Sequence, residues 1–347
     1  MLRNIVFASA RAPTALSLAL GAPGLAVFLW LGLPLPWLLG PLAATGLWVV
    51  FRPEPLSVAP MARNLAIAAL GLQIGAGLTP DAAARLAGAP IAALGLVAST
   101  VAAMAAGWVV YRRWAGWDPA TSFLAAAPGA LSTTLALLQT GQGDAGRVLL
   151  AQTVRLILLV SVFPLAFPGA TLEQARTLWS PGEAALALAA AALLVGVLVK
   201  TRTPAAWILG PALSVSALTG TGVITGGPPL WSFLAGLYVV GVATGAKLSA
   251  LRDGWREGLS AACVGLLLMA AATGATAFAV APIIGLPFGA VWLAFSPGGF
   301  EAMVALAVAL DLEPAFVAAA HVARVLGLTV LLPLGFRWIV QKPENDR

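Results

Sequence analysis

The stretch Trp37-Leu38-Leu39-Gly40-Pro41 recurs 170 residues later as Trp207-Ile208-Leu209-Gly210-Pro211. Gly71 and Gly75 recur at the same spacing as Gly241 and Gly245. Further along the chain, Pro128-Gly129 recurs as Pro297-Gly298 and Arg155 as Arg324, each 169 residues later. Ordered matches at nearly one offset predict two homologous halves, residues 1–170 and 171–347.

The composition predicts an integral membrane protein. Of the 347 residues, 60% are hydrophobic and 9% are charged, with a mean hydropathy of +0.95. A soluble domain carries about 25% charged residues. Each half contains six apolar elements, near 14–33, 36–51, 61–78, 90–111, 119–140 and 145–167, and near 184–199, 204–220, 230–247, 257–281, 287–310 and 314–338. The longer ones are sufficient to cross a hydrocarbon core as helices.

The fifth element of each half is interrupted by Pro-Gly, at Ala127-Pro128-Gly129 and at Ser296-Pro297-Gly298-Gly299. It is either a kinked span or a re-entrant hairpin, and the distribution of Lys and Arg favours the hairpin. If every element spans, ten basic residues lie inside and seven outside. If the fifth element returns, 15 lie inside and only Arg85 and Arg176 lie outside, as the positive-inside rule favours. The predicted fold is therefore all-α, with two inverted repeats, about ten spanning helices and two re-entrant hairpins.

The rare residue types exclude several functional classes. The chain has one cysteine, Cys263, and one histidine, His321, whereas protein sites for zinc, copper or iron usually recruit several such ligands. We therefore expect no metal, no cofactor and no enzymatic activity. The formal net charge is +6, and the basic residues are scattered between the apolar elements. This distribution is typical of a membrane protein, whose loop charges set its orientation, and not of a nucleic-acid-binding face.

Inverted repeats with interrupted helices are typical of secondary transporters, because the broken ends present backbone N–H groups to a substrate near the bilayer midplane. The candidate substrate-binding positions at the two breaks are Gly129, Ser132, Thr133, Gly298 and Gly299. Alternatively, the breaks only shape the fold, and the hydroxyl groups bond to their own helix.

Glu301 is the one acid well inside an apolar element. A buried carboxylate is unfavourable unless it is paired or neutral, so Glu301 is a candidate to carry a coupling proton or to bind a cation. The alternative is a salt bridge to Arg324.

Arg155 and Arg324 each lie about ten residues into the sixth element, roughly 15 Å deep. Two buried guanidinium groups favour an anionic substrate, because Arg binds carboxylate or phosphate through a bidentate fork. Alternatively, each Arg caps the carbonyl groups that end the preceding half-helix, near Ala127 and Ser296. His321 precedes Arg324 by one helical turn and is a candidate pH-responsive coupling group or a structural residue.

The paired W-x-L-G-P motifs, the Gly-rich third element, and A-P-G-A and S-P-G-G before Q-x-x-R and H-x-x-R resemble the AbrB-type duplicated bacterial membrane proteins. The resemblance covers nearly the whole chain. It implies a bacterial inner-membrane protein related at the level of fold to cation–proton antiporters and anion transporters. Members also carry the labels ammonia monooxygenase and regulator of gene expression. One His, one Cys and one intramembrane acid do not readily build a monooxygenase site.

We expect a secondary transporter of a small, anionic solute, with H⁺ or Na⁺ as the coupling ion and both termini cytoplasmic. The alternative is a membrane sensor that regulates gene expression through a partner protein. The sequence does not determine the substrate or the oligomeric state, for which a homodimer is one option.

Overall fold

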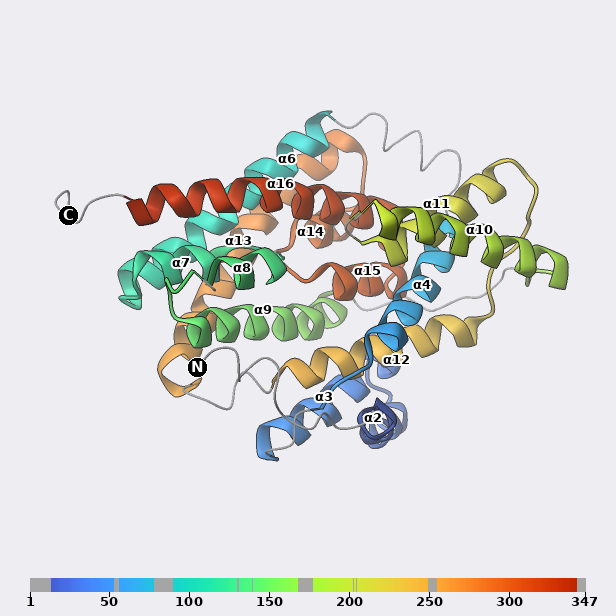
Figure 1. The fold of residues 1–347 in the computed structure, drawn as a ribbon, viewed down its shortest axis with the longest axis horizontal. Helices are drawn as coiled ribbons and strands as arrows, with labels where there is room; N and C mark the ends of the chain where they lie inside the picture. Colours follow the sequence, from blue (N-terminus) through green and yellow to red (C-terminus); the bar gives the residue numbers. More distant parts are fainter. Residues whose placement is uncertain are drawn as a thin grey trace.

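The computed structural model describes residues 14–52, 56–77, 90–129, 131–138, 140–167, 177–201, 203, 205–248 and 255–341. This described part is helical and contains no strand; an isolated bridge pairs Leu178 with Gly227. The helices form an elongated bundle in which α16 lies along one long side (Figure 1).

The helices up to residue 167 are α2 (Thr14–Trp30), α3 (Pro36–Phe51), α4 (Pro60–Gly77), α6 (Pro90–Val109) with a π-helical turn (Val110–Trp114), α7 (Pro119–Ala126), α8 (Leu131–Leu138) and α9 (Ala145–Ala166). The later helices are α10 (Pro181–Lys200), α11 (Ala206–Gly220), α12 (Leu230–Ala246), α13 (Trp255–Ile284), α14 (Phe288–Phe295), α15 (Phe300–Ala309) and α16 (Pro314–Gln341). These bounds agree closely with the predicted elements, and each interrupted element is two short helices.

Local sequence signals set many helix starts. Proline is the first residue of α3, α4, α6, α7, α10 and α16, where its missing N–H group leaves no helical hydrogen bond unmade. Asp118 and Asp144 cap α7 and α9 by accepting from the backbone N–H groups of Thr121 and Arg147. Ser180 and Glu183 form a reciprocal capping box at the start of α10.

A proline lies at each of the two breaks. The proline ring disfavours the helical region for the residue before it, although other prolines, such as Pro41 and Pro211, lie inside helices. Ala127 and Ser296, which precede Pro128 and Pro297, are accordingly extended, with ψ angles of 120° and 140°. Helices α7 and α14 therefore end here, and their last carbonyl groups are left without helical partners.

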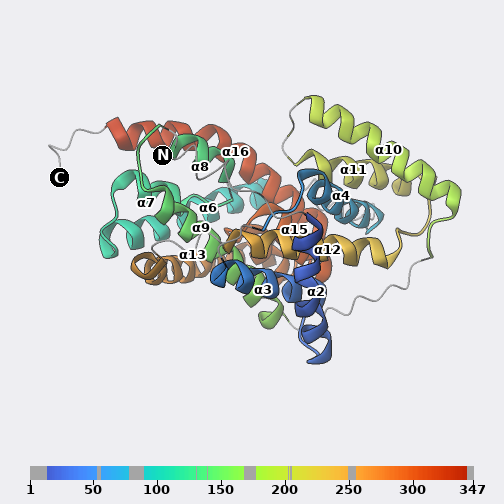
Figure 2. The same cartoon turned by 60° about the horizontal axis from the view of Figure 1, so that its bottom comes forward.

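Glycines let helices from the two parts of the sequence pack at backbone contact. A Cβ atom added to Gly71 on α4 would come within 2.5 Å of the carbonyl oxygen of Ile208 on α11. A Cβ atom on Gly241 of α12 would likewise clash with the carbonyl oxygen of Leu38 on α3. Helix α4 thus packs on α11, and α12 packs on α3 (Figure 2).

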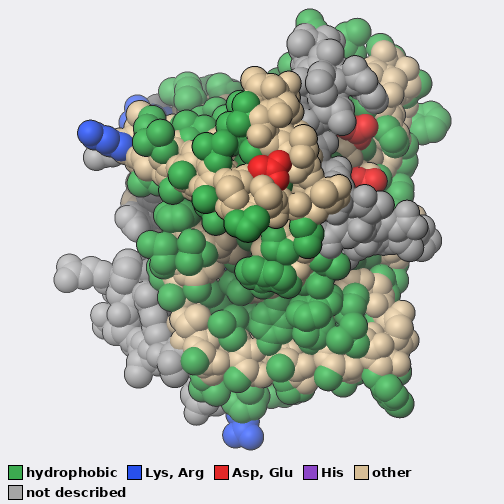
Figure 3. Space-filling model, turned by 90° about the vertical axis from the view of Figure 1, so that its right-hand side faces the viewer, with side chains coloured by type: hydrophobic (Ala, Val, Ile, Leu, Met, Phe, Trp, Pro, Cys, Tyr) green, Lys and Arg blue, Asp and Glu red, His purple; other side chains and the backbone are tan. Residues whose placement is uncertain are grey.

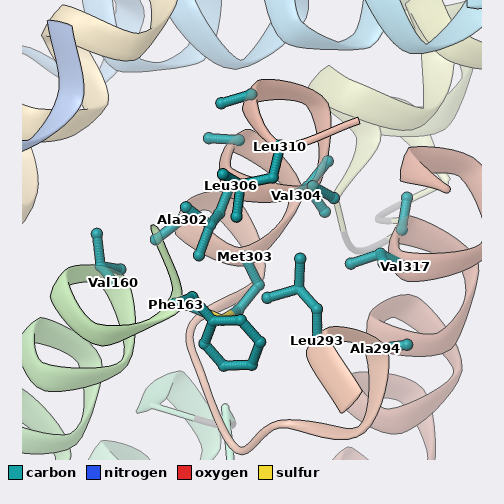
Figure 4. Packing of buried hydrophobic residues seen from close by; sticks show 14 of the residues in the cluster. Val160, Phe163, Leu293, Ala294, Ala302, Met303, Val304, Leu306, Leu310 and Val317 are labelled. Atoms are coloured by element: carbon teal, nitrogen blue, oxygen red, sulfur yellow. The ribbon is translucent and has the colours of Figure 1, made fainter. Parts of the chain in front are cut away.

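Helix α15 lies at the centre of the core and contacts α4, α9, α12, α14 and α16. Its side chains from Ala302 to Ala307 are almost fully buried where they are described. Figure 4 shows Met303 of α15 facing Phe163 of α9 and Leu293 of α14. Helix α15, which follows the second break, is therefore central to the bundle. Helix α8, which follows the first break, contacts mainly α9 and α16.

The described helices suit a multi-pass membrane protein. Five of them are long and apolar enough to cross a membrane: Pro90–Trp114, Ala145–Ala166, Pro181–Lys200, Gly258–Ile284 and Pro314–Ile339. Shorter apolar helices are α2, α3, α11 and α12. The surface in Figure 3 is dominated by hydrophobic side chains, with few charged ones. The prediction of ten spans and two re-entrant hairpins stays a prediction.

Candidate functional site

Arg155 and Gln152 of α9 cap the broken end of α7. The Arg155 guanidinium donates from Nη1 to the carbonyl oxygen of Ala125 at 3.3 Å and from Nη2 to that of Ala127 at 2.9 Å. Gln152 lies one turn earlier and donates to the carbonyl oxygen of Leu124 at 3.2 Å. Carbonyl groups that the proline-induced break leaves without helical partners are thus bound by a neighbouring helix.

Arg324 of α16 does the same at the broken end of α14. Its Nη1 donates to the carbonyl oxygens of Ser296 at 2.6 Å and Phe295 at 3.3 Å, and its Nη2 donates to that of Gly298 at 3.3 Å. Both arginines therefore make the capping contacts that are the alternative to anion binding. It does not exclude anion binding, because a guanidinium has five N–H donors and keeps its charge.

The two breaks meet each other. Gly129 has a φ angle of +74°, and a Cβ atom added to it would lie 3.1 Å from the carbonyl oxygen of Gly298 and 3.6 Å from Nη2 of Arg324. A Cβ atom on Gly299 would lie 3.1 Å from Cδ1 of Leu156, the residue after Arg155. The structure thus brings Gly129, Gly298, Gly299 and the two arginines into one region.

Among the described side chains of this region, the two that carry charge are positive and buried. Arg155 is 3% exposed and Arg324 is 4% exposed, and both border the contact between the two breaks, where their like charges repel each other. Neither forms an ion pair with any residue in the part of the chain that the structure describes. Neighbouring carbonyl dipoles offset part of the charge, but burying two like charges remains unfavourable. A bound anion would relieve this repulsion.

Several buried polar atoms in the elements that form this region have no hydrogen-bond partner among the described residues. They are Nε of Arg324, Nε2 of His321 and Oγ1 of Thr134. Buried polar groups without protein partners are uncommon and usually bind water, an ion or a ligand. These atoms are therefore available to a polar ligand.

His321 is fully buried on α16, and its Nδ1 lies 3.0 Å from the carbonyl oxygen of Val317, one turn earlier. It occupies the position that corresponds to Gln152, but it does not cap the break. Thr133 is half-buried on α8. Ser132 and Glu301 belong to the first turns of α8 and α15, and their side chains lie outside the described part.

The carbonyl groups near Ala127 and Ser296 are the predicted acceptors, and the structure adds those of Leu124, Ala125, Phe295 and Gly298. The signal for them is the proline that follows at each break, but this signal is not specific, because Pro41 and Pro211 lie inside helices. Within the described residues, no group of three His, Cys, Asp or Glu side chains could hold a metal ion. The described side chains of this site offer hydrogen-bond donors and positive charge, which suits binding of an anion.

Fold and site together define a helical, multi-pass membrane-embedded protein with two broken helices capped by buried arginines. The chain belongs to the AbrB family: the family described as transition state regulatory protein AbrB matches residues 37–340. It is 26% identical over 351 residues to the uncharacterized protein YhjN of Bacillus subtilis (strain 168), covering 92% of this chain and 91% of that protein. No solved structure matches the chain.

Proposed function

We propose that this protein is a secondary transporter of a small anionic solute and that the solute binds where the two broken helices meet. The observation that carries the proposal is the pair of buried arginines, Arg155 and Arg324, beside the contact between Gly129 and Gly298. Positive charge held by capping bonds is preorganised, so an anion can bind without a rearrangement of the guanidinium groups.

We further propose that the two halves are inverted repeats. Gly71 packs on Ile208 while Gly241 packs on Leu38, and both pairs correspond at the 170-residue offset. Gly75 packs on Ala212 while Gly245 packs on Leu42, again at that offset. Such reciprocal contacts support an approximate two-fold relation between the halves, and the 15-to-2 distribution of Lys and Arg favours an axis in the membrane plane, which makes the repeats inverted. Transporters built in this way move one bundle against the other around a central site.

The remaining assignments follow from charge and burial. The 15-to-2 distribution of Lys and Arg supports a bacterial inner-membrane location with both termini cytoplasmic. We assign coupling to H⁺ or Na⁺ through Glu301 and His321, which lie on the broken helix α15 and on the helix α16 that carries Arg324. The lipid bilayer and the anion are the partners that this assignment requires.

Ligand-dependent thermal stabilisation tests the binding step. The purified protein is heated in lipid nanodiscs with a panel of small carboxylates, phosphate and sulfate, each at fixed ionic strength. We expect at least one anion to raise the melting temperature of the wild type in proportion to the logarithm of its concentration. Arg155→Lys keeps the charge and should retain part of this shift. If no anion raises the melting temperature of the wild type above its value without anion, the proposed site is refuted.

A further inference from the structure

A cavity of about 580 Å³ lies between α6 and α16, with Phe123 of α7 and Phe295 of α14 in its wall. This volume falls within the range of small-molecule sites. The two helices contact each other and cross near one edge of the bundle (Figure 1). The lining residues that the structure describes are apolar except for Arg324 and Thr100, whose hydroxyl donates to its own helix.

The cavity opens toward the lipid-facing surface. Val97 and Val101 of α6 are each 61% exposed, and Leu331 of α16 is 62% exposed. All three line the cavity, and they belong to helices long and apolar enough to cross a membrane. A molecule in the hydrocarbon core could therefore enter sideways between α6 and α16.

The corresponding place in the other half is filled. Phe163 of α9 and Trp292 of α14 correspond at the 169-residue offset to Leu332 and Phe123, which line the cavity. The rings of Phe163 and Trp292 lie 5.0 Å apart, and Trp292 donates to the carbonyl oxygen of Ala270 on α13. Gly327, also in the cavity wall, replaces the larger Leu158. Smaller side chains in one half thus leave open a space that aromatic rings occupy in the other.

Among the described residues that line the cavity, Arg324 is the one that carries a charge. Its Nη atoms are held by backbone carbonyl groups, whereas its Nε has no partner among the described residues. An apolar cavity that is open to lipid and has one fixed cation in its wall is complementary to an apolar chain with an anionic head. Because Arg324 is only 4% exposed, the head must be small.

We infer that the cavity between α6 and α16 binds a single-chain amphiphile whose carboxylate lies against Arg324 and whose chain extends between the two helices toward the bilayer. Binding at this cavity does not require the proposed transport to occur. The shared residue is Arg324, so an amphiphile bound here would also influence the charge at the two breaks.

A photoreactive probe tests this inference. Palmitic acid carrying a diazirine in its chain is added to the purified protein in neutral phosphatidylcholine nanodiscs and irradiated, and the modified peptides are identified by mass spectrometry. We expect adducts on α6 and α16 that unlabelled palmitate displaces. Methyl palmitate, which lacks the charge, should displace them much more weakly. Equal displacement by the ester, or stronger displacement by phosphatidic acid than by palmitate, would overturn the assignment of a single-chain carboxylate.

Filling the cavity supplies the matched control. A Cβ atom on Gly327 meets nothing within 4 Å, so a side chain can begin there without a clash, and Gly327→Leu places a leucine in the cavity wall. Gly196 of α10 is equally open, and Gly196→Leu makes the same change away from the cavity. We expect Gly327→Leu to lose the adducts on α6 and α16 and Gly196→Leu to keep them. Undiminished labelling of a folded Gly327→Leu protein would refute this site, whereas thermal stabilisation by small anions would still report on the proposed transport site.

Discussion

Replacing Arg155 by Ala should destabilise the protein strongly, because it leaves carbonyl groups at the end of α7 without partners. The guanidinium binds the carbonyl oxygens of Ala125 and Ala127, both in fully buried residues. An unsatisfied buried acceptor costs about 1–3 kcal/mol, so two such acceptors correspond to a loss of about 2–6 kcal/mol.

The matched control is Arg147→Ala on the same helix. Arg147 has a side chain that is 40% exposed and forms an ion pair with Asp144 at 3.5 Å. An exposed pair of this kind contributes about 0–1 kcal/mol. The comparison therefore separates loss of a buried cap from loss of a positive charge on α9.

The assay is equilibrium unfolding by steric trapping in bicelles, with both variants measured against the wild type in the same lipid. We expect the free energy of unfolding to fall several times further for Arg155→Ala than for Arg147→Ala. If the two variants unfold with equal free energies, the capping bonds do not stabilise the break and the reasoning is wrong.

Three further predictions concern packing, coupling and topology. Gly71→Ala places a methyl group against the Ile208 carbonyl and should lower the free energy of unfolding by about 1–3 kcal/mol. Gly196→Ala should leave it almost unchanged. Equal thermal unfolding of the two variants would contradict the close contact between α4 and α11. Glu301→Gln should abolish proton-coupled accumulation in vesicles while keeping downhill exchange, and an unchanged pH profile of accumulation would exclude Glu301 as the coupling group. In a chain without Cys263, cysteines at residues 83 and 201 should react with an impermeant maleimide from opposite sides of the membrane, and reaction from the same side would refute the inverted topology.

Much of the helical architecture is predictable from local sequence. Helix α3 occupies the predicted range of 36–51, because Pro36 begins it and the apolar run ends at Arg52. Pro128 and Pro297 lie at the two breaks, but proline alone does not predict a break, because Pro41 and Pro211 lie inside α3 and α11. The depth of Arg155 and Arg324 in their apolar elements indicates two roles, anion binding and capping of the broken helices, and the structure shows the capping bonds.

Long-range packing is not predictable in this way. The glycines at positions 71 and 241 are visible as repeats, but nothing local indicates that each meets the second helix of the other half. The cavity between α6 and α16 depends on which side chains oppose each other across two helices far apart in the sequence. Its signal is the replacement of Phe163 by Leu332 and of Leu158 by Gly327 at the repeat offset, which identifies the cavity only once the fold is known.

The most direct test of the transport proposal is charge movement across a membrane. Proteoliposomes on a solid-supported membrane are exposed to concentration jumps of the same small anions, with Arg147→Ala and Arg324→Ala as the paired variants. We predict a transient current for at least one anion that Arg147→Ala retains and Arg324→Ala loses, with the amount of folded protein in each sample matched. Absence of current from the folded wild type with every anion would contradict the proposal of anion transport. If an anion nevertheless stabilised the protein against heat, a sensor that binds the anion would be the better account.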